Sequence, residues 1–281
     1  MAEPRSHAYE AISPVLTIKD LAVAFRRRRG VETVISGVSL QVWPGEIVGV
    51  IGETGSGKSL TALSVLRLLP HGAHVQRGRI ELLGRSLLDL PDAEMRALRG
   101  SEIAYVPQDA SRALNPLLAI GRQVGEPLEI HKGSSLRRAW GRAVEVLAAV
   151  GIAEATARAQ EYPHQFSGGM QQRALVATAL TLTPPLIVAD EPTSSLDITV
   201  QAQILALLSD IRDRSGTSIL FISHDLGVVA SLCDWVYVMH KGRIVESGAA
   251  RRVFEEPAAD YTRMLLAATP LWDQPGAAGD G

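Results

Sequence analysis

The segment IVGVIGETGSGKSLTALSVLRLL, residues 47–69, decides the fold. Its first five residues, Ile47 to Ile51, are apolar on both faces, which is typical of a central strand in a parallel sheet. A glycine loop follows, and Lys58 to Leu69 then has helical periodicity until Pro70 and Gly72. Strand, glycine loop and helix in this order predict a P-loop βα unit.

The loop GETGSGKS, Gly52 to Ser59, fits the pattern G-x-x-x-x-G-K-[ST]. Glycines let the backbone curl so that N–H groups point inward at phosphate oxygens, and the helix that follows adds positive potential. Lys58 is then placed to reach the β- and γ-phosphates, and the Ser59 hydroxyl to bind Mg²⁺. A plain glycine turn is the alternative interpretation. The predicted nucleotide-binding residues here are Gly52, Glu53, Thr54, Gly55, Ser56, Gly57, Lys58, Ser59 and Leu60.

Strand patterns lie on both sides of this unit. Val15 to Phe25 alternates between apolar and polar residues, and Val31 to Trp43 follows an arginine-rich turn. Leu186 to Asp190 and Ser218 to Ser223 are short apolar runs of the buried type. These runs predict further strands of the same fold.

Two other regions have a distinct pattern. VYVMHKGRIVE, residues 236–246, has a Lys-Gly turn between β-branched runs and predicts a hairpin near the sheet edge. Residues from about 110 to 183 are rich in Ala, Leu, Arg and Glu, so they are predicted to be mostly helical. We interpret the second region as a helical subdomain inserted into an α/β core.

Asp190 ends the apolar run LIVAD, and Glu191 follows it. A carboxylate at the end of a buried strand is costly unless it is paired or bound to a metal. Beside a P-loop, Mg²⁺ is the natural partner. Glu191 is then placed to orient or deprotonate a water near a γ-phosphate. Helix capping is the alternative role for either acid.

Gln108 and His224 are two further polar candidates. Gln108 lies in YVPQD, after a short apolar run and at the start of the helical region, where its amide is able to reach Mg²⁺ or water. His224 follows the strand run SILFIS, at the edge where such sheets bind ligands, and is able to hydrogen-bond a γ-phosphate. An ordinary loop glutamine and a structural histidine are the competing interpretations.

The segment FSGGMQQR, Phe166 to Arg173, is a second candidate for holding phosphate. Ser167, Gly168 and Gly169 stand where a helix is predicted to begin, so an N-cap hydroxyl and free backbone N–H groups face outward. The alternative is an ordinary N-cap with a close-packed glycine pair. The segment follows the first loop by about a hundred residues, which raises the question of how both can serve one phosphate.

The composition limits the class of protein. The 281 residues carry a net charge of −2, which leaves no basic footprint for nucleic acid. Cys233 is the single cysteine, which excludes an internal disulfide and multi-cysteine metal centres. No apolar run approaches the roughly 18–20 residues of a membrane span, and the N-terminus lacks the apolar stretch of a signal peptide. We expect a soluble chain that acts at a membrane only through other chains.

The order of these motifs closely resembles that of ATP-binding-cassette (ABC) ATPases, from about Val15 to Pro270. FSGGMQQR is similar to the family's signature motif, usually written LSGGQ, and SSLD (Ser194 to Asp197) is similar to its D-loop. Gln108 and His224 match the Q-loop glutamine and the switch histidine. Phe25 is placed like the aromatic residue that stacks on adenine, with a core strand phenylalanine as the alternative.

The resemblance implies an α/β fold, a P-loop NTPase (RecA-like) core with an antiparallel β-subdomain and an inserted helical subdomain at about residues 109–183. The cassette domain would span residues 15–270, between flexible ends at 1–14 and 271–281. ATP and Mg²⁺ are the implied ligands. The implied catalytic residues are Lys58, Gln108, Glu191 and His224, the implied metal ligands are Ser59, Gln108 and Asp190, and the nucleotide contacts also include Phe25, Ser167, Gly168 and Gly169.

Longer segments resemble the dipeptide, oligopeptide and nickel importer group of the family. They are EYPHQFSGGMQQR, EPTSSLDITVQAQIL, SHDLGVVA, YTRMLLAATP and SGKSLTALSVLRLLP, the last being closer to the first of the two ATPase subunits of such systems. Some features depart from the pattern. Met170 replaces the usual glutamine of the signature, and PQDASRALNP lacks the aspartate-proline of the common form. Many relatives have a cysteine-rich tail, whereas Cys233 is the single cysteine of this sequence.

In this family two ATPase subunits pair head to tail, with ATP between the P-loop of one and the SGG segment of the other. The resemblance therefore implies a second ABC ATPase subunit, with the first-subunit features favouring a heterodimer. It also implies two transmembrane permease subunits, an extracytoplasmic solute-binding protein and a place at the cytoplasmic face of the membrane. Peptides, nickel chelates and other small solutes stay open as cargo. A cassette protein acting on ribosomes or DNA and an exporter ATPase are the rival interpretations, although no nucleic-acid partner is expected.

Overall fold

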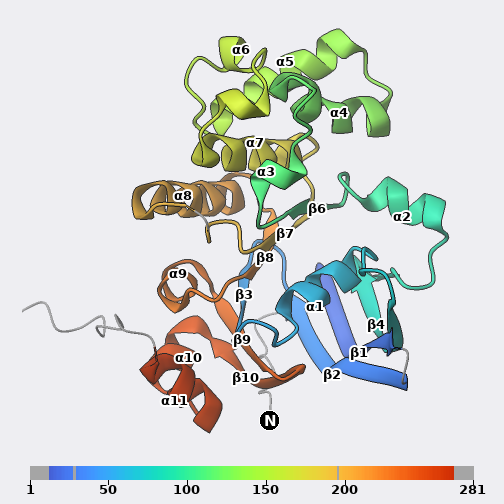
Figure 1. The fold of residues 1–281 in the computed structure, drawn as a ribbon, viewed down its shortest axis with the longest axis vertical. Coiled ribbons are helices and arrows are strands. Elements are labelled where there is room, and N and C mark those ends of the chain that lie inside the picture. Colours follow the sequence, from blue (N-terminus) through green and yellow to red (C-terminus); the bar gives the residue numbers. More distant parts are fainter. Residues whose placement is uncertain (1–12, 28–29, 195, 269–281) are drawn as a thin grey trace, which may run out of the picture. The chain divides into compact units, whose positions relative to one another are not determined.

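The computed structural model describes residues 13–27, 30–194 and 196–268. Contacts divide the chain into two compact units. The first unit holds the residues up to Leu88 and those from Leu220 onward, and the second unit holds Asp89–Ile219. Each unit combines helices and strands, in agreement with the predicted α/β class (Figure 1). The predictions for residues 1–12 and 271–281 and for part of SSLD, Ser195, lie outside the described residues.

The first unit contains the glycine loop and most of the strands. Its elements are β1 (Leu16–Arg27), β2 (Gly30–Val42), β3 (Ile47–Ile51), α1 (Lys58–Val65), β4 (Ala73–Leu82), β5 (Arg85–Ser86), α9 (Leu226–Leu232), β9 (Trp235–His240), β10 (Arg243–Ala249), α10 (Ala250–Glu255) and α11 (Asp260–Ala267). The strand β8 (Ser218–Ile222) begins in the second unit and ends in the first.

An antiparallel sheet forms one part of the first unit. Its strand order is β2-β1-β4-β5, and β1 pairs antiparallel with both β2 and β4. Figure 1 shows β1, β2 and β4 side by side. The large apolar residues of β1, Leu16, Ile18, Leu21 and Val23, lie in the buried core. The two strands predicted from this pattern are confirmed, and the sheet is the antiparallel one that the fold prediction required.

A second sheet supports the glycine loop. β3 pairs in parallel with β9, which turns back into the antiparallel strand β10. Every residue of β3 and of β8 is buried, which confirms these runs as central strands. The hairpin predicted at Lys241 and Gly242 is also confirmed, with β10 at the end of the strand order. The glycine loop therefore starts from a fully buried strand.

The helix after the glycine loop is shorter than predicted. The periodic pattern continues to Leu69, whereas α1 ends at Val65. Arg67 has a φ of 50°, in the left-handed region, and Leu68 N–H donates to the Leu63 carbonyl oxygen at 2.9 Å. Leu66 is still buried beyond the helix end. The apolar pattern thus indicates which residues are buried, and it continues beyond the last residue of the helix.

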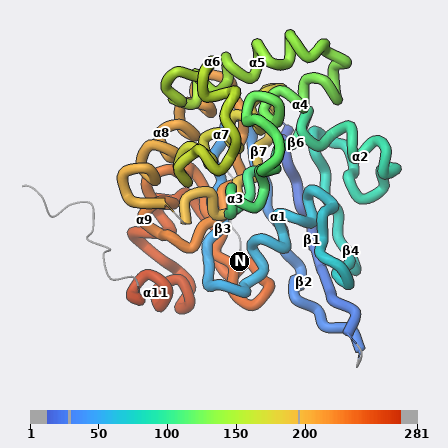
Figure 2. The backbone as a smooth tube through the Cα atoms, turned by 45° about the horizontal axis from the view of Figure 1, so that its top comes forward, coloured from blue at the N-terminus to red at the C-terminus, as the bar shows by residue number. Residues whose placement is uncertain are grey.

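The second unit is mainly helical. Its elements are α2 (Asp92–Leu98), β6 (Ile103–Val106), α3 (Ala110–Ala113), α4 (Ile120–Lys132), α5 (Leu136–Ala149), α6 (Ala155–Arg158), the 3-10 helix η1 (Pro163–Gln165), α7 (Gly168–Leu180), β7 (Leu186–Asp190) and α8 (Ile198–Ser215). Figure 2 shows α4, α5, α6 and α7 gathered together, and α4, α5 and α7 are in mutual contact. The predicted helical character of this stretch is confirmed.

No helix of the described residues is long and apolar enough to cross a membrane.

Candidate functional site

The backbone of the glycine loop contacts the side chain of Lys58. Lys58 is 4% exposed, and its Nζ donates to the carbonyl oxygens of Gly52 at 2.7 Å and of Glu53 at 3.0 Å. Gly52 has a φ of 147°, and a Cβ there would lie 2.1 Å from the Met239 carbonyl oxygen, so only glycine fits. The loop therefore wraps around a buried ammonium group, which is the arrangement that binds an anion.

The rest of the loop fits a phosphate chain. The helix α1 begins at Lys58, and its N-cap residue Gly57 provides no side-chain cap, which suits a phosphate at the first helical N–H groups. A Cβ added at Gly55 would meet nothing within 4 Å. The buried Ser56 Oγ has no hydrogen-bond partner in the described part of the chain. The residues present thus match the ATP that the resemblance implies.

Two other candidates belong to the first unit. His224 lies two residues after the end of β8 and is exposed. Phe25, at the outer part of β1, is half-buried and lies outside the buried core. The guanidinium carbon of Arg27 lies 5.3 Å from the centre of the Phe25 ring, within the range of a cation–π contact. Stacking of Phe25 on adenine stays a prediction.

In the second unit, Asp190 ends β7 and is only 5% exposed. The Tyr105 hydroxyl on β6 donates to Asp190 Oδ2 at 3.2 Å. Burial, the Asp190 charge and this hydrogen bond raise the pKa of Tyr105 far above its usual value, so the hydroxyl stays a donor. The buried carboxylate of Asp190 therefore has a fixed orientation.

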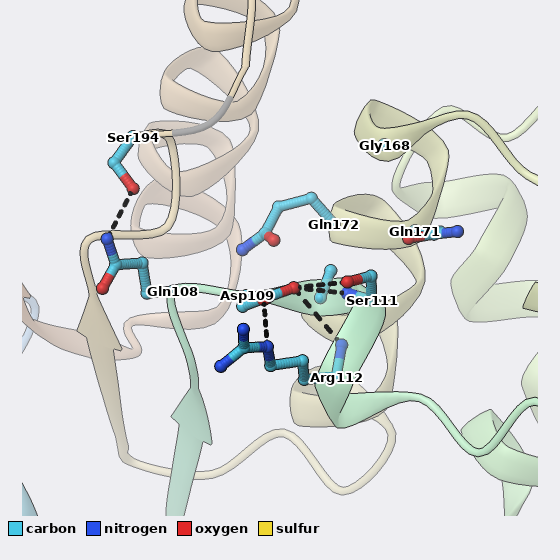
Figure 3. A pocket seen from close by; sticks show the side chains of 9 residues that line it. Gln108, Asp109, Ser111, Arg112, Gly168, Gln171, Gln172 and Ser194 are labelled. Carbon is cyan, nitrogen blue, oxygen red and sulfur yellow. Dashed lines mark hydrogen bonds and ion pairs between the residues drawn. The ribbon is translucent and has the colours of Figure 1, made fainter.

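Glu191 and Gln108 meet in the same unit. Gln108 Nε2 lies 3.2 Å from Glu191 Oε2 and 3.2 Å from Ser194 Oγ. Figure 3 shows the contact between Gln108 and Ser194. The backbone of Glu191 has a φ of 48°, a conformation that non-glycine residues adopt rarely and that recurs at functional sites. The side-chain amide of Gln108 thus contacts Glu191, and both are predicted catalytic residues.

The donor set suits a small, hard cation. Mg²⁺ prefers oxygen ligands and is held by one or two carboxylates together with substrate phosphates. Asp190 offers a buried carboxylate in the second unit, and Ser59 offers a hydroxyl in the first. Gln108 can use its amide oxygen while its Nε2 contacts Glu191. Among the described residues there is no cluster of three or more His, Cys, Asp or Glu side chains. Each unit thus offers oxygen ligands of the kind that Mg²⁺ takes beside a nucleotide phosphate.

The SGG segment combines both interpretations given to it. Ser167 is the N-cap of α7, and its Oγ accepts from the Met170 N–H at 3.4 Å. A Cβ at Gly169 would lie 2.5 Å from Val200 Cγ1 at the start of α8, so this glycine allows close packing. At Gly168 the nearest atom would be 4.0 Å away, on Leu196. Gly169 thus packs against its own chain, and Gly168 leaves space for a ligand.

A cavity of about 470 Å³ lies beside the start of α7 (Figure 3). Gly168, Gln171 and Gln172 line one side, and the segment from Gln108 to Arg112 lines the other. Asp109 Oδ1 accepts from the backbone N–H groups of Ser111 and Arg112 and thereby starts α3. The Gln108 loop and the SGG segment are therefore neighbours within the second unit.

The two glycines should respond differently to alanine. Gly169→Ala is expected to lower the free energy of unfolding by about 1–3 kcal/mol, because the new methyl group overlaps Val200. Gly168→Ala is expected to change it by less than about 0.5 kcal/mol. Urea unfolding of the two variants measures the difference. Equal stability of both variants would contradict the packing role of Gly169.

Sequence reasoning missed two residues of the site, since Tyr105 contacts Asp190 and the Tyr261 hydroxyl accepts from the Glu53 N–H. It named Ser194 as part of the SSLD segment but not its contact with Gln108. Tyr105 lies opposite Val188 in the parallel register, so it shares a face with Asp190, two residues further along β7. This register exists only in the folded sheet, so no local signal points to Tyr105. No short-range signal points to Tyr261.

Comparisons with known proteins identify the family of the chain. The family description "ABC transporter" matches residues 35–194. A protein named probable peptide ABC transporter ATP-binding protein y4tR, from Sinorhizobium fredii, is 46% identical over 91% of this chain and 77% of its own length. The oligopeptide transport ATP-binding protein OppD of Bacillus subtilis is 43% identical over 94% of this chain and 74% of its own length.

A longer relative is also similar. The peptidoglycan transport ATP-binding protein YejF of Agrobacterium fabrum is 47% identical over 93% of this chain, which spans only 48% of that protein.

Solved structures resemble the fold as well. A dimeric post-hydrolysis state of the ATP-binding cassette MJ0796, bound to ADP and Pi, has a TM-score of 0.75 and 28% sequence identity. The match covers 84% of this chain and 99% of the other. A structure of cbiO1 from Clostridium perfringens has a TM-score of 0.74 at 25% identity, covering 86% and 91%. The predicted P-loop NTPase fold is confirmed, and the chain belongs to the ABC transporter family as an ATP-hydrolysing cassette.

Proposed function

We propose that this chain binds and hydrolyses ATP to drive an importer of di- or oligopeptides. The contact between Gln108 and Glu191, next to the buried Asp190, is the observation that carries the catalytic part of the proposal. The relatives OppD and y4tR, at 43% and 46% identity, are named for oligopeptide and peptide transport, which supports peptides as cargo. Nickel chelates and other small solutes are the alternatives.

Each residue has a role in this proposal. Lys58 and the N–H groups of the glycine loop bind the β- and γ-phosphates. Asp190, Ser59 and Gln108 hold Mg²⁺, which neutralises charge on the phosphate oxygens. Glu191 orients and deprotonates the attacking water.

His224 and Phe25 complete the proposed contacts within one chain. The exposed His224 hydrogen-bonds the γ-phosphate from the end of β8, and Phe25 stacks on the adenine from β1. The Gln108 amide would serve both groups at once, with its oxygen on Mg²⁺ and its Nε2 on Glu191. Metal binding and the position of the general base are thereby linked.

The SGG segment serves the nucleotide of a second chain. Ser167 and the open side of Gly168 present a helix start to a γ-phosphate held by the partner's P-loop. The MJ0796 cassette, similar in fold, is described as dimeric with ADP and Pi. We propose a second ABC ATPase subunit as the partner, and the first-subunit features of the sequence favour a heterodimer.

The remaining proposed partners span or border the membrane. They are two permease subunits and an extracytoplasmic solute-binding protein, with this chain at the cytoplasmic face. Leu117 is 81% exposed on a turn that Gln123 holds, since Gln123 Nε2 donates to the carbonyl oxygens of Asn115 and Leu118. The adjacent Leu118 is also exposed, and neighbouring exposed apolar side chains are a feature of protein contact sites. We place a permease contact there.

The proposal is tested with the assembled complex in lipid vesicles. ATP supplied to this chain should drive saturable accumulation of a labelled short peptide delivered by the binding protein. A complex with Lys58→Met should show none, and one with Lys19→Met, at an exposed lysine of β1, should match the wild type. Accumulation of a nickel chelate but of no peptide would contradict the proposed cargo.

A further inference from the structure

The C-terminal motif YTRML belongs to α11 and has no part in the proposed reaction. The start of this helix is tied to the strand β10. Both carboxylate oxygens of Glu246 accept backbone N–H groups, from Ala258 at 2.8 Å and from Ala259 at 3.0 Å. Arg263 donates back to the carbonyl oxygens of Pro257 and Ala258. Figure 1 shows α11 directly after α10, in the same unit as the glycine loop. The helix is thus firmly held at its start.

Tyr261 extends from this helix to the glycine loop. Its hydroxyl accepts from the Glu53 N–H at 3.3 Å, and its ring lies on His240 with the ring centres 3.8 Å apart. His240 ends β9 next to the hairpin turn, where the Gly242 N–H donates to the Ser56 carbonyl oxygen at 2.9 Å. The loop is therefore held at two points by the C-terminal part of the chain.

The first of these points acts on the lysine. The Glu53 N–H and the Gly52 carbonyl belong to one peptide group, which is planar and rigid. Tyr261 holds the N–H end of this group, and Lys58 Nζ donates to its carbonyl end at 2.7 Å. If the peptide rotates, the acceptor of Lys58 moves with it.

We propose that Tyr261 is a positioning residue for nucleotide binding, because it fixes the peptide group that orients Lys58. The inference rests on the proposed role of Lys58 in holding phosphate. It also assigns a role to α11, which links the end of the cassette to the nucleotide loop. Burial holds the pKa of Tyr261 above its usual value, so the hydroxyl stays neutral.

Tyr261→Phe removes the hydroxyl and keeps the ring on His240. We expect MgADP to bind about 3- to 10-fold more weakly to the full chain, as measured by calorimetry, because one neutral hydrogen bond is lost. Turnover at saturating ATP should change by less than about twofold, because Glu191, the proposed general base, is untouched and bound ATP itself holds Lys58 in place. A change in KM without a change in kcat distinguishes positioning for binding from general damage.

Tyr237→Phe is the matched control. The Tyr237 hydroxyl also accepts a backbone N–H in the first unit, from Gln41 at 3.0 Å, but not one of the glycine loop. Its loss should lower the melting temperature and leave MgADP affinity unchanged. Unchanged or tighter MgADP binding by Tyr261→Phe would overturn the inference, as would an equal loss of affinity in Tyr237→Phe.

Lys58→Met separates this inference from the proposed function. If Lys58→Met loses MgADP binding while Tyr261→Phe binds normally, only the role of Tyr261 fails. If Lys58→Met binds MgADP like the wild type, the lysine does not hold the nucleotide. Both proposals then fail, whatever Tyr261→Phe does, because Tyr261 acts through Lys58.

Discussion

Glu191→Gln is expected to lower ATP turnover by about 10²- to 10⁴-fold, the contribution typical of a general base. The amide has nearly the same shape as the carboxylate and can still accept from Gln108, so the local contacts survive. The glutamine amide cannot, however, take a proton from the attacking water. ATP affinity should therefore stay within a few-fold of the wild type. Phosphate release under single-turnover conditions, together with calorimetric ATP binding, measures both quantities.

The same variant should trap the closed pair of chains. ATP that binds between two chains but is not hydrolysed keeps favouring the closed state, because its affinity for that state is higher. Light scattering should then give the mass of two copies of the chain, or the mass of this chain together with the second ATPase subunit. Glu145→Gln, at an exposed glutamate of α5, is the control and should behave like the wild type. Near-normal turnover by Glu191→Gln would remove Glu191 from its proposed role.

Much of the fold could be predicted because burial leaves a pattern in the sequence. The strand Ile47–Ile51 is apolar on both faces because both are covered, and most of the apolar residues of β1 are likewise buried. The strand β4 was not predicted, since its residues from Gln76 to Arg79 are exposed and polar. The end of α1 was missed for the opposite reason, because Leu66 stays buried outside the helix.

The site could be predicted where chemistry is local. The N-cap role of Ser167 follows from residues that adjoin it, and so does the Lys58 loop. The packing of Gly169 on Val200 and the contact of Tyr105 with Asp190 depend on how separate elements pack, which local pattern does not encode. Tyr261 and the Glu53 N–H are 208 residues apart, so their contact exists only in the folded chain.

Ser167→Asp should be nearly as disruptive as the loss of Glu191. Aspartate caps a helix as well as serine does, so the start of α7 is kept. Its carboxylate, however, would face the γ-phosphate bound by the other chain, and such like-charge contact costs several kcal/mol. Turnover should fall by roughly 10²- to 10³-fold. ATP binding to the isolated chain, which uses its own P-loop, should stay unchanged in calorimetry. Ser167→Asn, a neutral N-cap, should keep turnover within a few-fold.

The central claim is that ATP held by one chain's P-loop is hydrolysed only against the SGG segment of another. The most direct test measures ATP turnover per chain while the protein is diluted from paired to single chains. Light scattering follows the mass, and the wild type and both Ser167 variants are compared. ATP should stay bound while wild-type and Ser167→Asn turnover falls with the paired fraction, and Ser167→Asp should stay nearly inactive at every concentration. Full turnover in a strictly monomeric preparation, or in Ser167→Asp, would contradict the claim.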